Sequence, residues 1–159
     1  MSDKLTLITV AKFNAAGWGN FIFDKGNPEV SYSGYSMRIR ADNNKLQLTI
    51  GDGTGRRNKT AQEINYGEYQ FMAYSWNGSS FLSAINSSIV SGGTDWSITI
   101  PPTTGALYMG ARASLTEFSN QSQAYGLVFN KAASRRQIIQ NYYAIRHELA
   151  IRRGIYLAA

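Results

Sequence analysis

Arginine and aromatic side chains supply the most distinct candidate chemistry in this sequence. Two arginines alternate along an expected strand, and a second basic group follows in the run Arg56-Arg57-Asn58-Lys59. Guanidinium groups bind phosphate and carboxylate groups through paired hydrogen bonds, and a nearby aromatic ring can stack on a sugar face. The residues that we expect to form a glycan-binding site are Trp18, Tyr32, Tyr35, Arg38, Arg40, Arg56, Arg57, Asn58 and Trp96. The alternative is that the rings line the rim of a core and the cations are ordinary surface charge.

A second cationic group lies at the expected start of a helix. Ser134 precedes Arg135 and Arg136 there. The first turn of a helix leaves backbone N–H groups free, and two arginines beside them make a candidate anion site. The helix dipole disfavours cations in this position, so tolerated surface arginines are the alternative reading.

Two glutamates, Glu63 and Glu68, stand close together and raise the question of glycoside hydrolysis. A retaining glycosidase needs two carboxyl groups about 5 Å apart. Asn65 lies between them and cannot share or relay a proton as a carboxylate does, and Gly67 interrupts the strand. We therefore predict no catalytic residues and no enzyme, with this stretch an exposed polar loop.

Metal chemistry has few candidate ligands. The chain contains no cysteine and one histidine, His147, so a transition-metal cluster is not expected. Oxygen ligands for calcium exist in expected loops, although their spacing does not require an ion. We predict no metal and no cofactor, with calcium as the alternative at Asp24, Asn27, Asp52 and Asp95.

The 159 residues suit one domain, and the net charge of +6 favours acidic partners: nucleic acid, anionic polysaccharide or lipid headgroups. The apolar run over residues 5–10 is too short for a signal peptide or a membrane span. We expect a chain made in the cytoplasm without a cleaved signal, and without membrane insertion.

Hydrophobic periodicity predicts short strands followed by one helix. In residues 5–11 both the odd-numbered and the even-numbered positions are largely apolar, as in a strand covered on both faces. The hairpin over 36–50 is apolar on one face only. Further strands are expected at 21–23, 69–76, 81–85, 96–100, 106–111 and 125–129, and polar connections at 51–59, 87–95 and 114–123. About nine strands with frequent turns favour an antiparallel sandwich.

The helix is expected at about 134–150. Ser134 and Gln137 have the spacing of a capping box, and four apolar residues then share one face: Ile138, Tyr142, Ile145 and Leu149. Gly154 is the expected end of the helix. A β-prone tail follows, and we expect a terminal strand at about 154–158.

Several of these pieces, in this order, resemble laminin-G-like domains. The strand ending in Phe129-Asn130 leads into the capped helix as in the closing segment of that family. The stretches 67–79, 83–87 and 107–112 resemble its Trp-His-x-Val-Ala, Leu-Tyr-Val-Asn-Gly and Leu-x-Ile-Gly-Ala-Arg segments. Gln137 and Ala133 depart from it, where the family has Glu and Leu. The resemblance covers residues 5–157.

The resemblance implies a single laminin-G-like domain over residues 1–159, an all-β, concanavalin A-like jelly roll with one C-terminal helix. Domains of this kind are common in bacteriophage structural proteins. The family's first strand is missing here, and the tail over 154–159 or a neighbouring subunit could cover the sheet edge that is left.

The predicted function is a non-catalytic structural or recognition domain of a phage particle, located in the virion. Its expected partners are surface polysaccharide or other virion proteins, in an oligomer or larger assembly. The alternatives are a glycan-active enzyme of the concanavalin A-like glucanase type and a basic nucleic-acid-binding protein. No nucleic-acid motif combines the scattered cations with stacking aromatics, so specific nucleic-acid binding is not expected.

Overall fold

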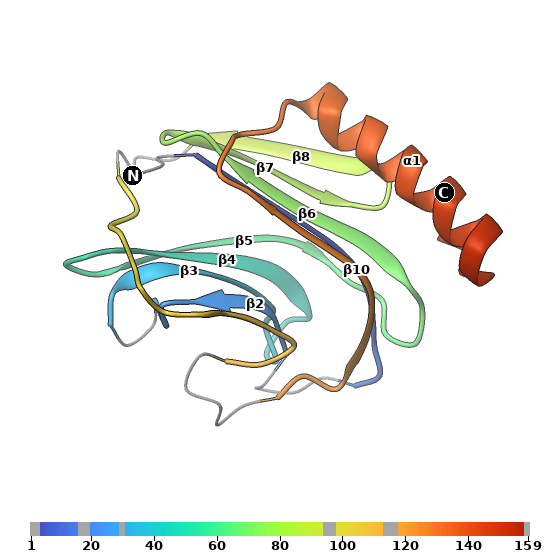
Figure 1. Ribbon diagram of the computed structural model, residues 1–159, viewed down its shortest axis with the longest axis horizontal. Coiled ribbons are helices and arrows are strands. Elements are labelled where there is room, and N and C mark those ends of the chain that lie inside the picture. Colours follow the sequence, from blue (N-terminus) through green and yellow to red (C-terminus); the bar gives the residue numbers. More distant parts are fainter. Residues whose placement is uncertain (1–3, 16–19, 29–30, 94–97, 113–117, 158–159) are drawn as a thin grey trace.

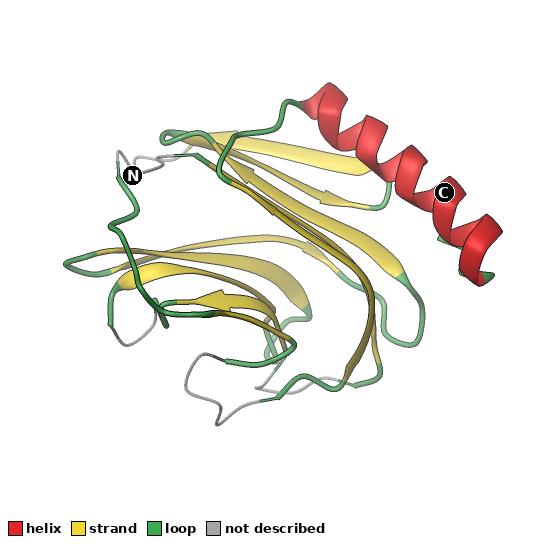
Figure 2. Cartoon of the chain, in the orientation of Figure 1, coloured by secondary structure: helices red, strands yellow, loops and turns green. Residues whose placement is uncertain are grey.

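A computed structural model of the chain describes residues 4–15, 20–28, 31–93, 98–112 and 118–157. Within these residues, ten strands form two antiparallel five-stranded sheets that face each other, and a helix covers one of them (Figures 1 and 2). Sheet A contains, in spatial order, β10 (Gln121–Phe129), β1 (Leu5–Phe13), β6 (Gln70–Trp76), β7 (Ser80–Ile85) and β8 (Ser88–Gly93). Sheet B contains β5 (Arg56–Glu63), β4 (Lys45–Asp52), β3 (Ser33–Ile39), β2 (Phe21–Lys25) and β9 (Leu107–Met109). The predicted all-β, antiparallel sandwich with a C-terminal helix is confirmed.

The main core lies between the two sheets. Because side chains alternate along a strand, one apolar set from each strand points inward, such as Met37 on β3 and Leu48 on β4. Tyr74 of β6 crosses this core, and its buried hydroxyl donates to the backbone carbonyl oxygens of Leu46 (3.1 Å) and Lys59 (2.9 Å) in sheet B. Burial raises the pKa of Tyr74, so the phenol stays protonated and joins the sheets.

The outer face of sheet A is also apolar, as the doubly apolar run at residues 5–11 predicts. Ile8 and Val10 on β1 and Phe71 on β6 point outward into a second apolar cluster. Helix α1 (Arg135–Arg153) lies over this face (Figure 1) and buries its four predicted apolar residues, Ile138, Tyr142, Ile145 and Leu149. Burial of each such side chain contributes about 1.5–3 kcal/mol, so the helix is held by packing.

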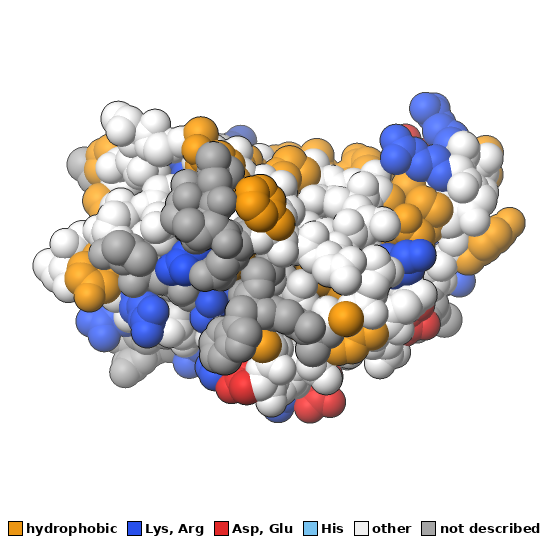
Figure 3. Space-filling model, turned by 90° about the horizontal axis from the view of Figure 1, so that it is seen from below, with side chains coloured by type: hydrophobic (Ala, Val, Ile, Leu, Met, Phe, Trp, Pro, Cys, Tyr) orange, Lys and Arg blue, Asp and Glu red, His pale blue; other side chains and the backbone are white. Residues whose placement is uncertain are grey.

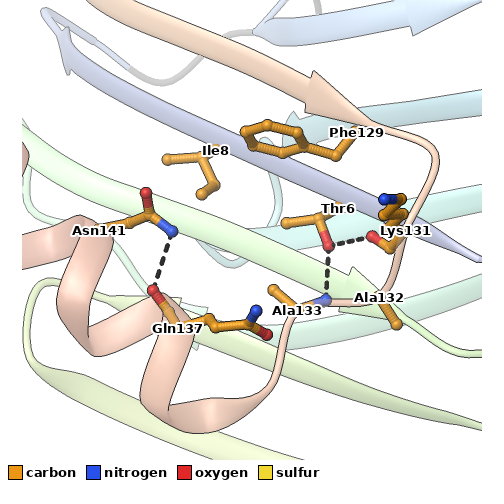
Figure 4. A pocket seen from close by; sticks show the side chains of 8 residues that line it. All are labelled: Thr6, Ile8, Phe129, Lys131, Ala132, Ala133, Gln137 and Asn141. Atoms are coloured by element: carbon orange, nitrogen blue, oxygen red, sulfur yellow. Dashed lines mark hydrogen bonds between the residues drawn. The ribbon is translucent and has the colours of Figure 1, made fainter.

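A buried hydroxyl pair holds the turn between β10 and α1. The Thr6 hydroxyl donates to the Lys131 carbonyl oxygen (2.6 Å) and accepts from the Ala133 N–H (2.9 Å; Figure 4). The Ser75 hydroxyl accepts from the same N–H (2.8 Å) and donates to the Ala133 carbonyl oxygen (2.9 Å). Ser134 then caps the helix, and the predicted capping box with Gln137 is present. Strands β1 and β6 therefore fix where the helix begins.

Two strands lie in segments that were predicted to be polar connections. The stretch predicted as a loop at 51–59 contains the start of β5, and the one at 87–95 contains β8. Both are edge strands, each bonded to one neighbour, so neither needs a continuous apolar pattern. The strand predicted at 96–100 is not formed at residues 98–100, and residues 96–97 lie outside the described part of the chain.

The C-terminal tail packs but does not pair. Gly154 has a φ of 62°, and the N–H groups of Gly154 and Ile155 both bond to the Leu149 carbonyl oxygen, which ends the helix. The predicted terminal strand at about 154–158 is wrong for the described residues 154–157, which form no strand. Leu157 instead joins the apolar cluster under α1, because the turn at Gly154 directs the chain back toward sheet A.

We expect Leu157→Ala to lower the free energy of unfolding by about 2–3 kcal/mol, because Leu157 is 4% exposed in the cluster under the helix. The matched control is Tyr156→Ala, whose side chain is 79% exposed and should change stability by less than about 0.5 kcal/mol. Urea unfolding followed by circular dichroism measures both. Equal effects of the two substitutions would contradict the packing of the tail.

Candidate functional site

The face of sheet B that points away from sheet A carries polar side chains on β3, β4 and β5, and no helix of the described residues covers it. On β3, β4 and β5 the residues that alternate with the core residues point to this outer face. Figure 3 views the face directly and shows Lys and Arg side chains gathered over one side of it. The strand register brings together Ser36, Arg38, Gln47, Thr49, Arg56, Asn58 and Thr60.

Side-chain hydrogen bonds cross this face from strand to strand. Arg38 Nε donates to Gln47 Oε1 (3.0 Å), and Gln47 Nε2 donates to Thr60 Oγ1 (3.3 Å). In the next row the Thr49 hydroxyl donates to Asn58 Oδ1 (2.8 Å). Gln47 and Thr49 are buried, whereas Asn58 and Thr60 are exposed. The buried β4 residues thus hold the side chains that a ligand would meet on β5.

Cations and one aromatic ring meet on the β2 side of the face. Arg38 pairs with Phe21 of β2 in the strand register, and its guanidinium lies 5.4 Å from the centre of the Phe21 ring. The guanidinium of Arg112 lies 5.8 Å from the same ring. Attraction between a guanidinium and an aromatic face favours both positions. Phe21 and Arg112 were not predicted to belong to the glycan-binding site. The one feature of the sequence that could have indicated Arg112 is its position just after the strand expected at 106–111.

Tyr32 approaches the opposite corner of the face. Tyr32 has a φ of 55°, and its backbone lies close to Gly51. A Cβ atom on residue 51 would stand 2.3 Å from the Tyr32 carbonyl carbon. Gly51 is therefore required for this turn to fold over the sheet. Because Gly51 pairs directly with Arg56, Tyr32 and Arg56 are neighbours at this corner. The Tyr32 side chain is 43% exposed.

Tyr35 and Arg40, both predicted to bind glycan, do not join this group. Tyr35 points into the core between the sheets, because it belongs to the same alternating set as Met37 and Ile39. Arg40 lies just beyond β3, where its guanidinium forms a two-point ion pair with Asp42, one contact being Nε to Oδ1 at 2.8 Å. The hydrogen bonds from Arg40 hold the pKa of the Asp42 carboxyl below its usual value.

Arg57 lies on the other side of β5 from Arg56. Its register partner is Ile50, whose side chain is in the core, so Arg57 points to the inner side of this edge strand. Its Nε lies 3.4 Å from Asp52 Oδ2. Hydrogen bonds from Thr54, together with the Arg57 charge, lower the pKa of Asp52. Adjacent arginines of one sequence motif therefore occupy different environments.

The remaining predicted residues fall into two groups. Trp18 and Trp96 lie outside the described part of the chain. Ser134, Arg135 and Arg136 stand together and exposed at the start of α1, but Ser134 and Gln137 already bond to each other's backbone N–H groups. The predicted anion site depended on free backbone N–H groups at the start of the helix. The capping box already occupies two of these groups, those of Ser134 and Gln137.

Acidic residues are dispersed. Glu63 ends β5 with its Oε1 3.8 Å from Lys45 Nζ, and Glu68 accepts from Asn65 Nδ2 (2.6 Å) in the turn before β6. Among the described residues, no three His, Asp or Glu side chains gather as metal ligands would. Nor does that part of the chain include a helix with the length and apolar character needed to cross a bilayer.

Comparisons with known proteins match the fold and not the sequence. No protein-family model matches the chain, and neither does any curated protein. A protein from Bacteroides ovatus that is named for carbohydrate binding matches at 15% identity and a TM-score of 0.67, over 87% of this chain and 40% of that one. A structure of botulinum neurotoxin type C, concerned with its interaction with two ganglioside molecules, matches at 14% identity and a TM-score of 0.60, over 89% and 36%.

The binding domain of botulinum neurotoxin DC, in complex with rat synaptotagmin II, matches at 12% identity and a TM-score of 0.58, over 91% of this chain and 36% of that one. The chain thus spans about two fifths or less of the proteins that it resembles. At such identities the likeness shows the fold alone. That fold is the two-sheet antiparallel β-sandwich.

Proposed function

We propose that this chain is a non-catalytic recognition domain that binds an anionic glycan on the outer face of sheet B. The observation that carries the proposal is that Arg38, Arg56 and Asn58 share one polar face, with the exposed Tyr32 at the Arg56 corner. The carbohydrate-binding and ganglioside-binding proteins of similar fold support it.

The arrangement suits a sugar that carries phosphate or carboxylate groups. Arg56 is exposed and forms no ion pair with any residue that the structure describes, so its guanidinium can donate hydrogen bonds to an anionic group of the ligand. Thr49 orients the Asn58 amide, which supplies donors to sugar hydroxyls. Tyr32 offers a ring for stacking at the same corner. Binding on this face leaves the core unchanged and should need little rearrangement.

The test uses the neighbouring arginines as a matched pair. A screen of acidic polysaccharides at low salt should identify a ligand, and Arg56→Gln should then weaken its binding by about tenfold or more. Arg57→Gln removes the same charge from the same strand but on the other face, and should change the affinity by less than about twofold. Titration calorimetry at two ionic strengths measures both, and higher salt should weaken binding.

Two results would contradict this site. If both arginine variants lose affinity equally, binding reflects overall charge and not the outer face of sheet B. If no acidic glycan is retained at low salt, the cations on this face serve another partner.

We propose that binding is not followed by hydrolysis. Glu63 and Glu68 are exposed and contact Lys45 and Asn65, respectively, and Asn65 stands between them in the sequence. Incubation of the protein with the polysaccharide that it binds should release no reducing ends. Release that disappears in Glu63→Gln or Glu68→Gln would instead assign the chain to the glycan-active enzymes.

The place of action that we propose is a bacteriophage particle, where the domain meets surface polysaccharide or neighbouring virion proteins. The motif resemblance to laminin-G-like domains motivates this placement. Strand β10 supports an assembly role, because it ends sheet A with no strand on its outer side among the described residues. Mass spectrometry of particles purified from the source strain should detect the chain at a constant ratio to capsid protein, and its absence from particles would remove this placement.

A further inference from the structure

A hollow lies between the two sheets, at one end of the sandwich. In Figure 1 the segment of residues 98–106 runs along this end from the level of sheet A to that of sheet B. The hollow has a volume of about 290 Å³, close to the lower limit of about 300 Å³ for small-molecule pockets. Its lining residues are Lys4, Leu5, Lys25, Tyr35, Ile100, Pro101, Pro102, Thr103, Val128, Phe129 and Asn130.

Three separate parts of the chain form its apolar walls. Leu5 begins β1 and Val128 lies near the end of β10, so both belong to sheet A. The crossing segment contributes Ile100, which packs against the main core, and then Pro101-Pro102. Two successive prolines restrict the backbone, so this wall keeps its shape without secondary structure.

Lys25 and Tyr35 are the polar lining residues on sheet B, and Lys4, Thr103 and Asn130 lie outside the strands. Lys25 of β2 and Tyr35 of β3 are direct register partners, so their side chains leave the sheet side by side. Lys25 Nζ donates to the Gly105 carbonyl oxygen (3.0 Å), which holds the ammonium near the crossing segment. Tyr35 is 9% exposed, and burial raises the pKa of its phenol, which therefore keeps its proton as a donor.

We propose that this hollow binds a small amphipathic carboxylate, with its alkyl part between the sheets and its carboxylate at the Lys25 ammonium and the Tyr35 hydroxyl. The charge of the lining points to an anion, because it contains Lys4 and Lys25 and no aspartate or glutamate. Apolar walls with an ammonium and a phenol side by side fit an alkyl chain with a single charged end. A sugar would need hydrogen-bonding groups on all sides, whereas Leu5, Ile100 and Val128 present apolar surface.

This site is distinct from the glycan site of the proposed function. Tyr35 and Arg38 lie on the same strand but on opposite faces of sheet B. A ligand in the hollow and a glycan on the outer face can therefore be tested separately, and failure of one leaves the other standing.

The test compares sodium octanoate with 1-octanol, which has the same chain length and no charge. Titration of the ¹⁵N-labelled full chain should show octanoate shifting the amide signals of residues around Tyr35, Ile100 and Val128. Octanoate should bind about tenfold more tightly than octanol, since bonds to a charged group are the stronger ones.

Substitutions then assign the carboxylate contacts. Tyr35→Phe keeps the ring and removes the hydroxyl, and Lys25→Met keeps the stem and removes the charge. Each should weaken octanoate binding by about fivefold to tenfold and leave octanol binding unchanged. Arg38→Gln, on the outer face of the same strand, is the control and should have no effect on either ligand. Circular dichroism checks that each variant is folded.

Equal binding of octanoate and octanol would overturn the proposal, because the cations would then have no role. Octanoate shifts centred on another surface, or no binding at millimolar concentration, would overturn it as well. Loss of octanoate binding in Arg38→Gln would place the anion on the wrong face of sheet B and likewise contradict the assignment.

Discussion

The structure depends on one constraint: sheet A is apolar on both faces, whereas sheet B is apolar on one. The inner face of sheet A packs on sheet B, and its outer face exposes Ile8, Val10 and Phe71 to water unless something covers them. Helix α1 supplies that cover with a single apolar stripe. The buried hydroxyls of Thr6 and Ser75, which hold the turn before the helix, make the docking specific because an unpaired buried N–H at Ala133 would be costly.

Helix α1 packs on sheet A, and the outer face of sheet B carries polar side chains instead of an apolar layer. The outer side chains of β3, β4 and β5 form a hydrogen-bonded grid on a rigid frame, buried on β4 and exposed on β5. A rigid frame suits recognition, since little side-chain freedom is lost when a ligand binds. Sheet B also places Tyr35 of β3 and Lys25 of β2 on its inner side, so one sheet serves two candidate sites of different chemistry.

Alternation along a strand decided which predicted site residues meet. Arg38, Arg56 and Asn58 fall on the outer face, whereas Tyr35 joins the core and Arg57 turns to the inner side of the edge strand. A one-residue change in register exchanges the two faces. The prediction that put Tyr35 beside the arginines depended on proximity in the sequence, and proximity along a strand brings neighbours to opposite faces.

Elements with strong local patterns could be predicted from the sequence. They are the doubly apolar strand at residues 5–11, the one-sided hairpin over 36–50 and the capped amphipathic helix with Ile138, Tyr142, Ile145 and Leu149 on one face. Their periodicity is local, so it can be read without a fold. Only the tertiary structure decided that the polar stretch at Arg56–Glu63 is an edge strand, because pairing with β4 supplies the order that its own pattern lacks. Only the tertiary structure brought Phe21, Arg38 and Arg112 together, since segments far apart in the chain meet there through contacts that no local pattern records.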